Sequence, residues 1–314
     1  MCQDRPMLHP RHVRDLLVDP QLHPRGQPHL SAASGLARVK GLMYVIADDE
    51  HHLGVFDPTG TADAPVALAR LFEGDLPQDK GQRKAAKPDL ESLAALPPLP
   101  GCPFGALLAL GSGSLSTRKV GVLAALDVHG ALSGRVAQVD LSPLYAPLRL
   151  KLGNLNIEGV FLASGELRLL QRGSKADARN ACISYDWNLI VPWLVGQKPV
   201  PPPAKAIQIM ELGDIDGVPL SLTDGAAVAG GGWVFSAVAE NSRNSVQDGP
   251  CVGSAVGVVG VDGAVRQLHR LEGSPKVEGI AVQEEGNDVV LTLVTDADDP
   301  AKASQVLEVR IALA

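Results

Sequence analysis

Short apolar runs, separated by clusters of Gly, Pro, Asp and Ser, continue along almost the whole chain. Apolar positions with helical spacing are scarce. Strand-length apolar runs bounded by turn residues are typical of an all-β protein. Dipeptides such as Ser164-Gly165 and Asp262-Gly263 separate consecutive runs and favour tight hairpin turns. The pattern therefore predicts many short antiparallel strands.

The runs group into five units, and each unit opens with the same short phrase. The phrase is an acidic or small polar residue, then Gly or Ser, then an apolar run. Its copies begin at Ser34, Glu91, Glu158, Asp224 and Glu278. One unit repeated at a similar spacing indicates a repeat architecture. Two β-sandwich domains, the rival interpretation, leave the five matching phrases unexplained.

Four units contain four strands each, and the last contains three. The predicted strands are 35–39, 42–47, 53–57 and 66–72; 90–96, 106–110, 120–127 and 135–141; 155–162, 166–171, 181–186 and 206–212; 220–228, 233–239, 254–261 and 264–271; and 277–282, 289–295 and 306–311. A strand-like piece over 12–18 belongs to no unit and would complete the last one. Such closure removes the exposed edges of an open array.

We therefore predict an all-β fold, a single five-bladed β-propeller over 1–314 that is closed by an N-terminal strand. The closing strand is expected at about 12–18, and the blades at about 33–72, 88–141, 153–213, 218–272 and 276–314. A six-bladed ring is the alternative, with a further unit inside 57–90 or 97–153.

Composition then narrows the classes of function. The 314 residues include 4% aromatic residues and carry a formal net charge of −7 without a basic stripe, which argues against nucleic-acid binding. No apolar run reaches the length of a membrane span. The first thirty residues lack the apolar core of a secretory signal, and four scattered cysteines suit a reducing compartment. We expect a cytoplasmic protein. The sequence does not identify a protein partner.

Propeller topology predicts where the polar residues of the phrase gather. The first strand of a blade is innermost, and the end of the second strand lies beside the start of the first. Residues at these two places should therefore converge on one mouth of the central channel. The inner set is Ser34, Glu91, Glu158, Asp224 and Glu278, and the outer set is Asp48, Arg172, Glu240 and Asp296. Arg118 and Arg179 each precede a third strand and should lie on the same rim.

Ionised carboxylates around a narrow channel would repel one another. They must share protons, pair with arginines or bind a cation, and oxygen ligands suit Ca²⁺. We therefore expect a calcium site built from Glu91, Glu158, Asp224, Glu278 and Asp296. The alternative is structural: each carboxylate accepts hydrogen bonds from backbone N–H groups of the neighbouring strand, and the Gly relieves crowding at the axis.

At the phrases of 34–37, 91–94, 158–160 and 278–281 the chain resembles bacterial phytase-like and esterase-like β-propellers. It is also similar to uncharacterised propeller families of unknown function. The resemblance covers roughly 30–314 and rests on short motifs. It implies a carboxylate-lined, calcium-binding central site and hydrolysis of a phosphoester or an ester.

The hypothesis from sequence is thus a calcium-dependent hydrolase of a phosphoester, ester or lactone, acting at the channel. Glu240 or Asp48 would be the general base, and Arg118, Arg172 or Arg179 would bind an anionic group of the substrate. The alternative is a non-catalytic propeller that binds a small anionic ligand or a protein on the same face.

Overall fold

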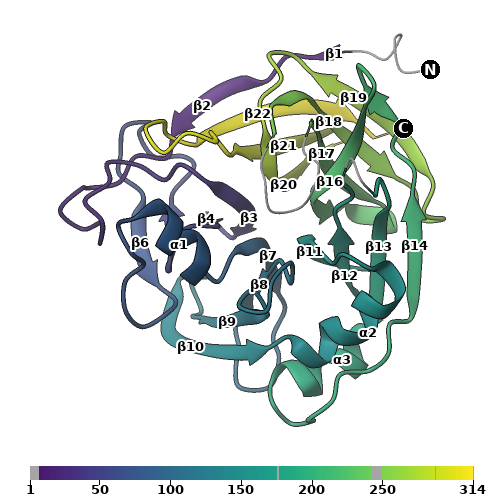
Figure 1. The fold of residues 1–314 in the computed structure, drawn as a ribbon, viewed down its shortest axis with the longest axis horizontal. Coiled ribbons are helices and arrows are strands. Elements are labelled where there is room, and N and C mark those ends of the chain that lie inside the picture. Colours follow the sequence, from purple (N-terminus) through teal and green to yellow (C-terminus); the bar gives the residue numbers. More distant parts are fainter. Residues whose placement is uncertain (1–6, 175–176, 242–248, 287, 314) are drawn as a thin grey trace.

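In the computed structural model, which describes residues 7–174, 177–241, 249–286 and 288–313, the strands form five sheets arranged in a ring (Figure 1). This is the predicted five-bladed β-propeller. The innermost strand of each blade contacts the innermost strands of the next blades, so β3, β7, β11, β16 and β20 surround the axis. No helix in these ranges is long and apolar enough to cross a membrane.

Within each blade the consecutive strands pair antiparallel and follow chain order from the axis outward, as in a meander. Blade 1 is β3 (Ala33–Val39), β4 (Leu42–Ala47), β5 (His52–Phe56) and β6 (Ala67–Arg70). Blade 2 is β7 (Leu90–Leu96), β8 (Ala106–Gly111), β9 (Val120–Leu126) and β10 (Leu132–Asp140). Blade 3 is β11 (Ile157–Ala163), β12 (Glu166–Gln171), β13 (Asn180–Asp186) and β14 (Ala206–Met210). Blade 4 is β16 (Val218–Ala227), β17 (Trp233–Glu240), β18 (Cys251–Val259) and β19 (Val265–Leu271), with the short β15 (Asp214–Ile215) beside β16. Blade 5 is β20 (Val277–Glu285), β21 (Asp288–Thr295) and β22 (Gln305–Ala312), joined by β2 (Arg11–Asp15).

The N-terminal segment closes the ring, as predicted. Strand β2 pairs antiparallel with β22 and becomes the outermost strand of blade 5. The chain before β2 adds a contact that the pattern did not predict, because β1 (Met7–Leu8) pairs parallel with β19 of blade 4. One short segment therefore joins the outer edges of two adjacent blades.

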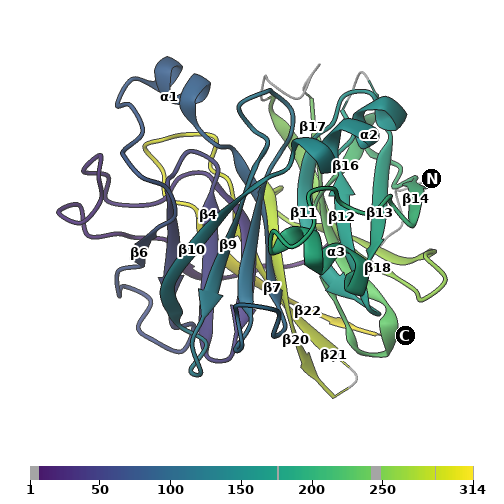
Figure 2. The ribbon, with the colours of Figure 1, turned by 90° about the horizontal axis from the view of Figure 1, so that it is seen from below.

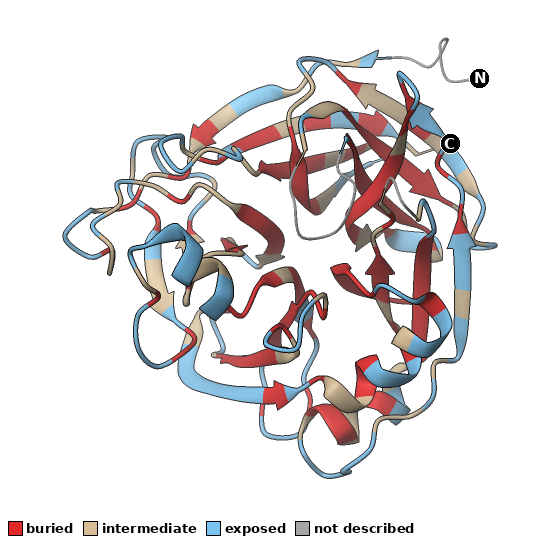
Figure 3. Ribbon diagram, in the orientation of Figure 1, coloured by how far each residue is buried: buried red, intermediate tan, exposed pale blue. Residues whose placement is uncertain are grey.

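Turn residues fix the hairpins. Ser164 and Gly165, between β11 and β12, both have positive φ, at 52° and 74°. Two consecutive positive φ values define a type I′ turn, whose twist matches that of the flanking strands. The apolar faces of the blades meet in clusters that lie mostly between neighbouring blades, whereas the outermost strands β10 and β14 are largely exposed (Figure 3).

Among the described residues, three α-helices interrupt the β pattern and were not predicted. They are α1 (Lys80–Ala86), α2 (Ser142–Leu152) and α3 (Trp187–Leu194). Helix α2 buries Leu144, Leu148 and Leu152, a four-residue spacing within a segment that also contains Pro147. Helices α1 and α2 lie in the connections between blades, at one end of the ring, and α3 lies toward the other end (Figure 2). The end that carries α1 and α2 is where the starts of the inner strands meet.

Candidate functional site

A β-bulge recurs at or beside the repeated phrase in every innermost strand, and in four blades it sets the direction of the repeated polar residue. In four blades the ladder skips one residue of the inner strand: Ser34, Glu91, Glu158 or Glu278. A bulged residue is unpaired, so its side chain leaves the regular alternation. In blade 4 the skipped residue is Thr223, one position earlier. Asp224 therefore stays in the ladder and has a different role.

The glycine of the phrase is explained by packing at the axis. A Cβ at Gly35 would lie 3.0 Å from the backbone nitrogen of Leu93, in the next blade. A Cβ at Gly279 would lie 3.0 Å from the backbone nitrogen of Leu36. Inner strands approach each other too closely for a side chain at these positions. The structural interpretation, in which the Gly relieves crowding at the axis, therefore accounts for the Gly of the phrase.

Arg172, just after β12, is the centre of a cluster that we call the arginine cluster. Its guanidinium lies 3.0 Å from Glu158, 2.6 Å from Glu240 and 3.3 Å from Glu278, and its side chain is only 13% exposed. These three carboxylates come from blades 3, 4 and 5. Although burial acts in the opposite direction, they raise the pKa of Arg172 well above its usual value. Arg172 therefore ties three blades together across the channel.

A second group, the acidic trio, consists of Asp48, Asp89 and Glu91. One carboxylate oxygen from each lies within 4.8 Å of the other two. The Lys87 ammonium contacts Asp48 and lies 2.9 Å from an oxygen of Asp89. Arg118, with its side chain 4% exposed, lies 2.8 Å from the other Asp89 oxygen. The Asp89 backbone has a positive φ of 56°, which is uncommon outside glycine and typical of functional sites.

Within the trio, Glu91 differs from its neighbours. Asp48 and Asp89 have cationic partners, whereas Glu91 has no hydrogen bond or ion pair with the described residues. Burial, together with the nearby charges of Asp89 and Glu158, raises the pKa of Glu91 well above its usual value. Burial likewise raises the pKa of Asp48 to about 7, although Lys87 opposes the shift. Asp48 can thus hold a proton near neutral pH, and the pKa of Glu91 is shifted in the same direction.

Lys276 forms the third group, with Asp296 and Asp298 of the β21–β22 loop. Its ammonium lies 3.0 Å from Asp296 and 2.6 Å from Asp298. It also lies 3.6 Å from Glu278, which connects this group to the arginine cluster. Burial and the adjacent Asp296 raise the pKa of Asp298 to about 7. Burial also raises the pKa of Glu278 to about 7.

The three groups together carry more negative than positive charge. The described cations in direct ion pairs with these carboxylates are Lys87, Arg118, Arg172 and Lys276. The carboxylates number twice as many: Asp48, Asp89, Glu91, Glu158, Glu240, Glu278, Asp296 and Asp298. Full ionisation would leave an excess charge of about −4 in a largely buried space. Protons or an added cation must balance part of it.

Two of the predicted site residues lie elsewhere. Asp224 accepts hydrogen bonds from the backbone N–H groups of Gly225 and Ile280, at 2.8 and 3.0 Å, and from that of Leu36. These contacts join blades 4, 5 and 1, as the structural alternative anticipated for such a carboxylate. Arg179 lies on an exposed loop and pairs with Asp177 at 2.5 Å, away from the three groups.

The remaining predicted residues converge on one mouth of the channel, but in separate groups. Glu158 and Glu278 bind Arg172, Asp296 binds Lys276, and Glu91 belongs to the acidic trio. Sequence reasoning missed Lys87, Asp89 and Lys276. Asp89 and Lys276 each stand two residues before a repeated glutamate, as does Asn156, which donates to Glu158. Extending the repeated phrase two residues upstream would have found Asp89 and Lys276.

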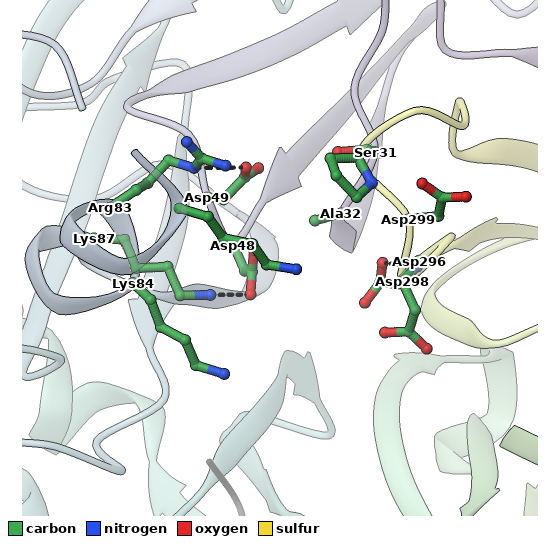
Figure 4. Close-up of a pocket in the computed structure, with 12 residues that line it drawn as sticks. Ser31, Ala32, Asp48, Asp49, Arg83, Lys84, Lys87, Asp296, Asp298 and Asp299 are labelled. Atoms are coloured by element: carbon green, nitrogen blue, oxygen red, sulfur yellow. Dashed lines mark hydrogen bonds and ion pairs between the residues drawn. The ribbon is translucent and has the colours of Figure 1, made fainter. Parts of the chain in front are cut away.

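A cavity of about 110 Å³ opens between blades 1 and 5, beside the acidic trio (Figure 4). Asp48, a member of the acidic trio, lines this cavity. Lys87, which contacts the trio, lines it as well. On one side, Arg83, Lys84 and Lys87 extend from α1 and the residue after it; on the other lie Asp296, Asp298 and Asp299. Arg83 pairs with Asp49 at 3.3 Å, and Lys87 pairs with Asp48.

One known protein family matches most of this chain. The family model of DUF6929, a family of unknown function, matches residues 29–311. The chain belongs to this family. A search of curated proteins found no match. The comparisons do not confirm the resemblance to phytase-like propellers.

Solved structures similar to this DUF6929 chain include enzymes. The catalytic domain of a GH62 α-L-arabinofuranosidase from Coprinopsis cinerea is 11% identical, with a TM-score of 0.54 and 97% of each chain covered. A glutaminyl cyclase from Myxococcus xanthus is 12% identical, with a TM-score of 0.50, covering 98% of this chain and 100% of that one. A gluconolactonase from Xanthomonas campestris is 11% identical, with a TM-score of 0.36, covering 90% and 87%. At these identities the likeness shows the fold alone.

Proposed function

We propose that this protein is a divalent-cation-dependent hydrolase of an ester, lactone or phosphoester, acting at the channel mouth that holds the acidic trio. The observation that carries the proposal is the spacing of Asp48, Asp89 and Glu91, whose ligand oxygens lie within 4.8 Å of one another. Calcium binds oxygen at about 2.3–2.6 Å, so two of its ligands are at most about 5 Å apart. The spacing and the donor type both fit Ca²⁺.

The excess of carboxylates over cations supports a cation here rather than at the arginine cluster. Arg172 already occupies the space between Glu158, Glu240 and Glu278. Glu91, by contrast, has no hydrogen bond or direct ion pair with the described side chains, although the Lys87 ammonium lies near enough to attract it. The Lys87 ammonium, which contacts the other two carboxylates, would compete with a metal ion for the same oxygens. When bound, the ion would polarise a carbonyl or phosphoryl oxygen and acidify a water.

The chain's own residues supply proton transfer and substrate binding in this proposal. Asp48, which also lines the adjoining cavity, is the residue that we expect to accept a proton from an attacking water. Glu240 is less suited to this role because its oxygens accept hydrogen bonds from Arg172 and the Gly249 backbone, at 2.6 and 2.7 Å. Arg118 has two buried guanidinium nitrogens, Nε and Nη2, without a hydrogen-bond partner. They favour an anionic group on the substrate.

Titration calorimetry of Ca²⁺ into chelator-stripped protein tests the cation site. Glu91→Gln should weaken Ca²⁺ binding at least tenfold, whereas Glu158→Gln, which alters the arginine cluster, should change it little. A screen of ester, lactone and phosphoester substrates with and without Ca²⁺ then tests the activity. Absence of Ca²⁺ binding, or equal binding by Glu91→Gln and wild type, would overturn the cation site.

A further inference from the structure

A groove of about 430 Å³ runs between the outer strands of blade 2 and helix α3 of blade 3. Leu123 and Ala125 of β9 and Val139 of β10 line one wall. Trp193 and Leu194, at the end of α3, line the other. The volume lies within the range of small-molecule sites, about 300–1,000 Å³. The groove lies at the outer rim of the ring, where β10 and α3 are adjacent in Figure 1.

The walls of the groove are continuous with the apolar core between blades 2 and 3. These five side chains belong to one core cluster, and each keeps only 4–9% of its surface exposed. Water between such walls finds few hydrogen-bond partners, so its replacement by an apolar chain is favourable. The middle of the groove therefore suits an alkyl group.

Each wall also carries one cation, Arg135 on β10 and Lys198 after α3. A β-bulge before Val136 and the positive φ of 83° at Gly134 set the position of Arg135, whose guanidinium donates to the Gly101 carbonyl at 2.8 Å. Neither cation has an ion pair with a described residue. Most N–H donors of the Arg135 guanidinium are therefore available to an anion.

Asp140 is the one carboxylate among the described residues that line the groove, and it lies far from Arg135. It ends β10, and a rise of about 3.3 Å per residue places it roughly 16 Å along the strand from Arg135. Hydrogen bonds from Ser142 and the nearby charge of Lys119 lower the pKa of Asp140. Asp140 therefore stays ionised at its own end of the groove and does not neutralise Arg135.

Apolar walls with unpaired cations suit an amphiphile that has an anionic head. We propose that this groove binds a medium-chain fatty carboxylate, with its head at Arg135, its alkyl chain between the two walls, and Lys198 adding to the positive potential. One water takes a share of about 30 Å³ in the liquid, and a methylene group is of similar bulk, so 430 Å³ holds roughly fourteen such groups. Because the groove is partly open, a chain of about eight to twelve carbons fits it.

Binding of a series of chain lengths tests the proposal. Octanoate, decanoate and dodecanoate are titrated into the full-length protein at pH 7.5 and low salt, below their critical micelle concentrations. Decanol and decylamine are the neutral and cationic controls for decanoate. Affinity should rise about fourfold for each added methylene until the chain exceeds the groove, and decanoate should bind at least fivefold more tightly than either control. Equal binding of decanoate and decanol, or no binding of any carboxylate, would overturn the proposal.

Trp193 reports whether the chain lies in this groove. A decanoate that is brominated near the end of its chain quenches tryptophan fluorescence on contact, and Trp193→Phe should remove most of that quenching. Trp187 and Trp233 do not line the groove and serve as internal references. Quenching that persists in Trp193→Phe would place the chain elsewhere and overturn the assignment.

A matched pair of substitutions on β10 separates the groove from the rest of the blade. Ala137 lines the groove and pairs with Leu123, so Ala137→Phe should fill the space and weaken decanoate and decanol alike. Val136 points to the opposite face of the strand, where it pairs with Ala124 of the core cluster between blades 1 and 2. Val136→Phe should therefore leave binding of both compounds unchanged.

Substitution of the cations tests recognition of the head. Arg135→Gln should weaken decanoate binding about fivefold, as expected for one partly exposed ion pair, and leave decanol binding unchanged. Lys198→Gln should act in the same direction with a smaller effect, and Lys151→Gln, on an exposed part of α2 outside the groove, is the control. Unchanged decanoate affinity in both Arg135→Gln and Ala137→Phe would overturn the assignment.

This proposal is independent of the cation site at the channel mouth. None of the residues that line the groove belongs to the acidic trio or to the arginine cluster. Glu91→Gln should accordingly weaken Ca²⁺ binding and leave decanoate binding intact, so the two proposals can fail separately.

Discussion

Arg172 is the residue whose replacement should disturb the channel most. Arg172→Met removes the only guanidinium that contacts Glu158, Glu240 and Glu278 among the described residues, while keeping much of the side-chain volume. At separations of 2.6–3.3 Å and an effective dielectric constant of about 20, each attraction amounts to about 5–6 kcal/mol. Most of this gain is offset by the desolvation of the charges.

The net effect is the cost of leaving buried carboxylates without a partner, about 3–5 kcal/mol at pH 8. At about 2 °C per kcal/mol for a chain of this size, Tm should fall by about 6–10 °C. The loss should be smaller at pH 5. Burial raises the pKa of Glu158 and Glu278, and Arg172 opposes this shift, so both pKa values rise further without it, and these carboxyls carry less charge at pH 5 than at pH 8.

Thermal melting followed by circular dichroism at pH 5 and pH 8 measures the effect. Arg179→Met is the control, because Arg179 is half exposed and its ion pair with Asp177 lies in solvent, where such pairs contribute little to stability. Adding Glu158→Gln and Glu278→Gln to Arg172→Met should restore part of the lost stability. An equal loss at both pH values, or no recovery in the triple variant, would refute the electrostatic role of Arg172.

Three further predictions concern stability and closure of the ring. Asp224→Ala leaves backbone N–H groups of three blades without an acceptor, so we expect a loss of about 2–4 kcal/mol and faster hydrogen exchange at Ile280 and Leu36; unchanged exchange would contradict this role. The folded-state pKa values of Asp48, Glu278 and Asp298 are about 7, above their ordinary values of 3.8 and 4.5, so the folded state binds more protons in this window. These groups should make the free energy of unfolding fall as pH rises from about 4.5 to 7, and denaturant titrations that show rising stability there would disprove the assignment. Removing residues 1–15 deletes β1 and β2 and exposes the edge of β22, so size-exclusion chromatography should show self-association; a monomer with unchanged Tm would argue against the closing role.

The blade count and the closing strand could be predicted because both follow from local pattern. Alternating apolar runs with turn residues specify strands and hairpins, and the last unit lacks a fourth strand. The helices were not predicted, and the reason also lies in the local sequence. Helix α2 carries Pro143 and Pro147, and α3 carries Pro192, so their segments resemble loops until the buried face of each helix is known.

The candidate site, like the fold, could be predicted from the sequence only in part. The sequence places Glu91, Glu158 and Glu278 at one mouth of the channel, since the repeated phrase fixes their position in each blade. It could not show that Asp224 differs, because Asp224-Gly225 matches the phrase while the bulge falls at Thr223. The register of a bulge depends on hydrogen bonds with the neighbouring strand, which are nonlocal.

By itself, then, the sequence determined the all-β repeat, the closure of the ring and the convergence of carboxylates on one face. Periodicity and turn chemistry act over a few residues, and propeller topology carries them to the axis. Only the tertiary structure decided which carboxylates are neutralised. Arg172 joins glutamates from three blades, and Lys87 contacts Asp48 and Asp89, while Glu91 has no direct ion pair among the described residues. Those pairings depend on distances of a few ångströms between segments that are far apart in the chain.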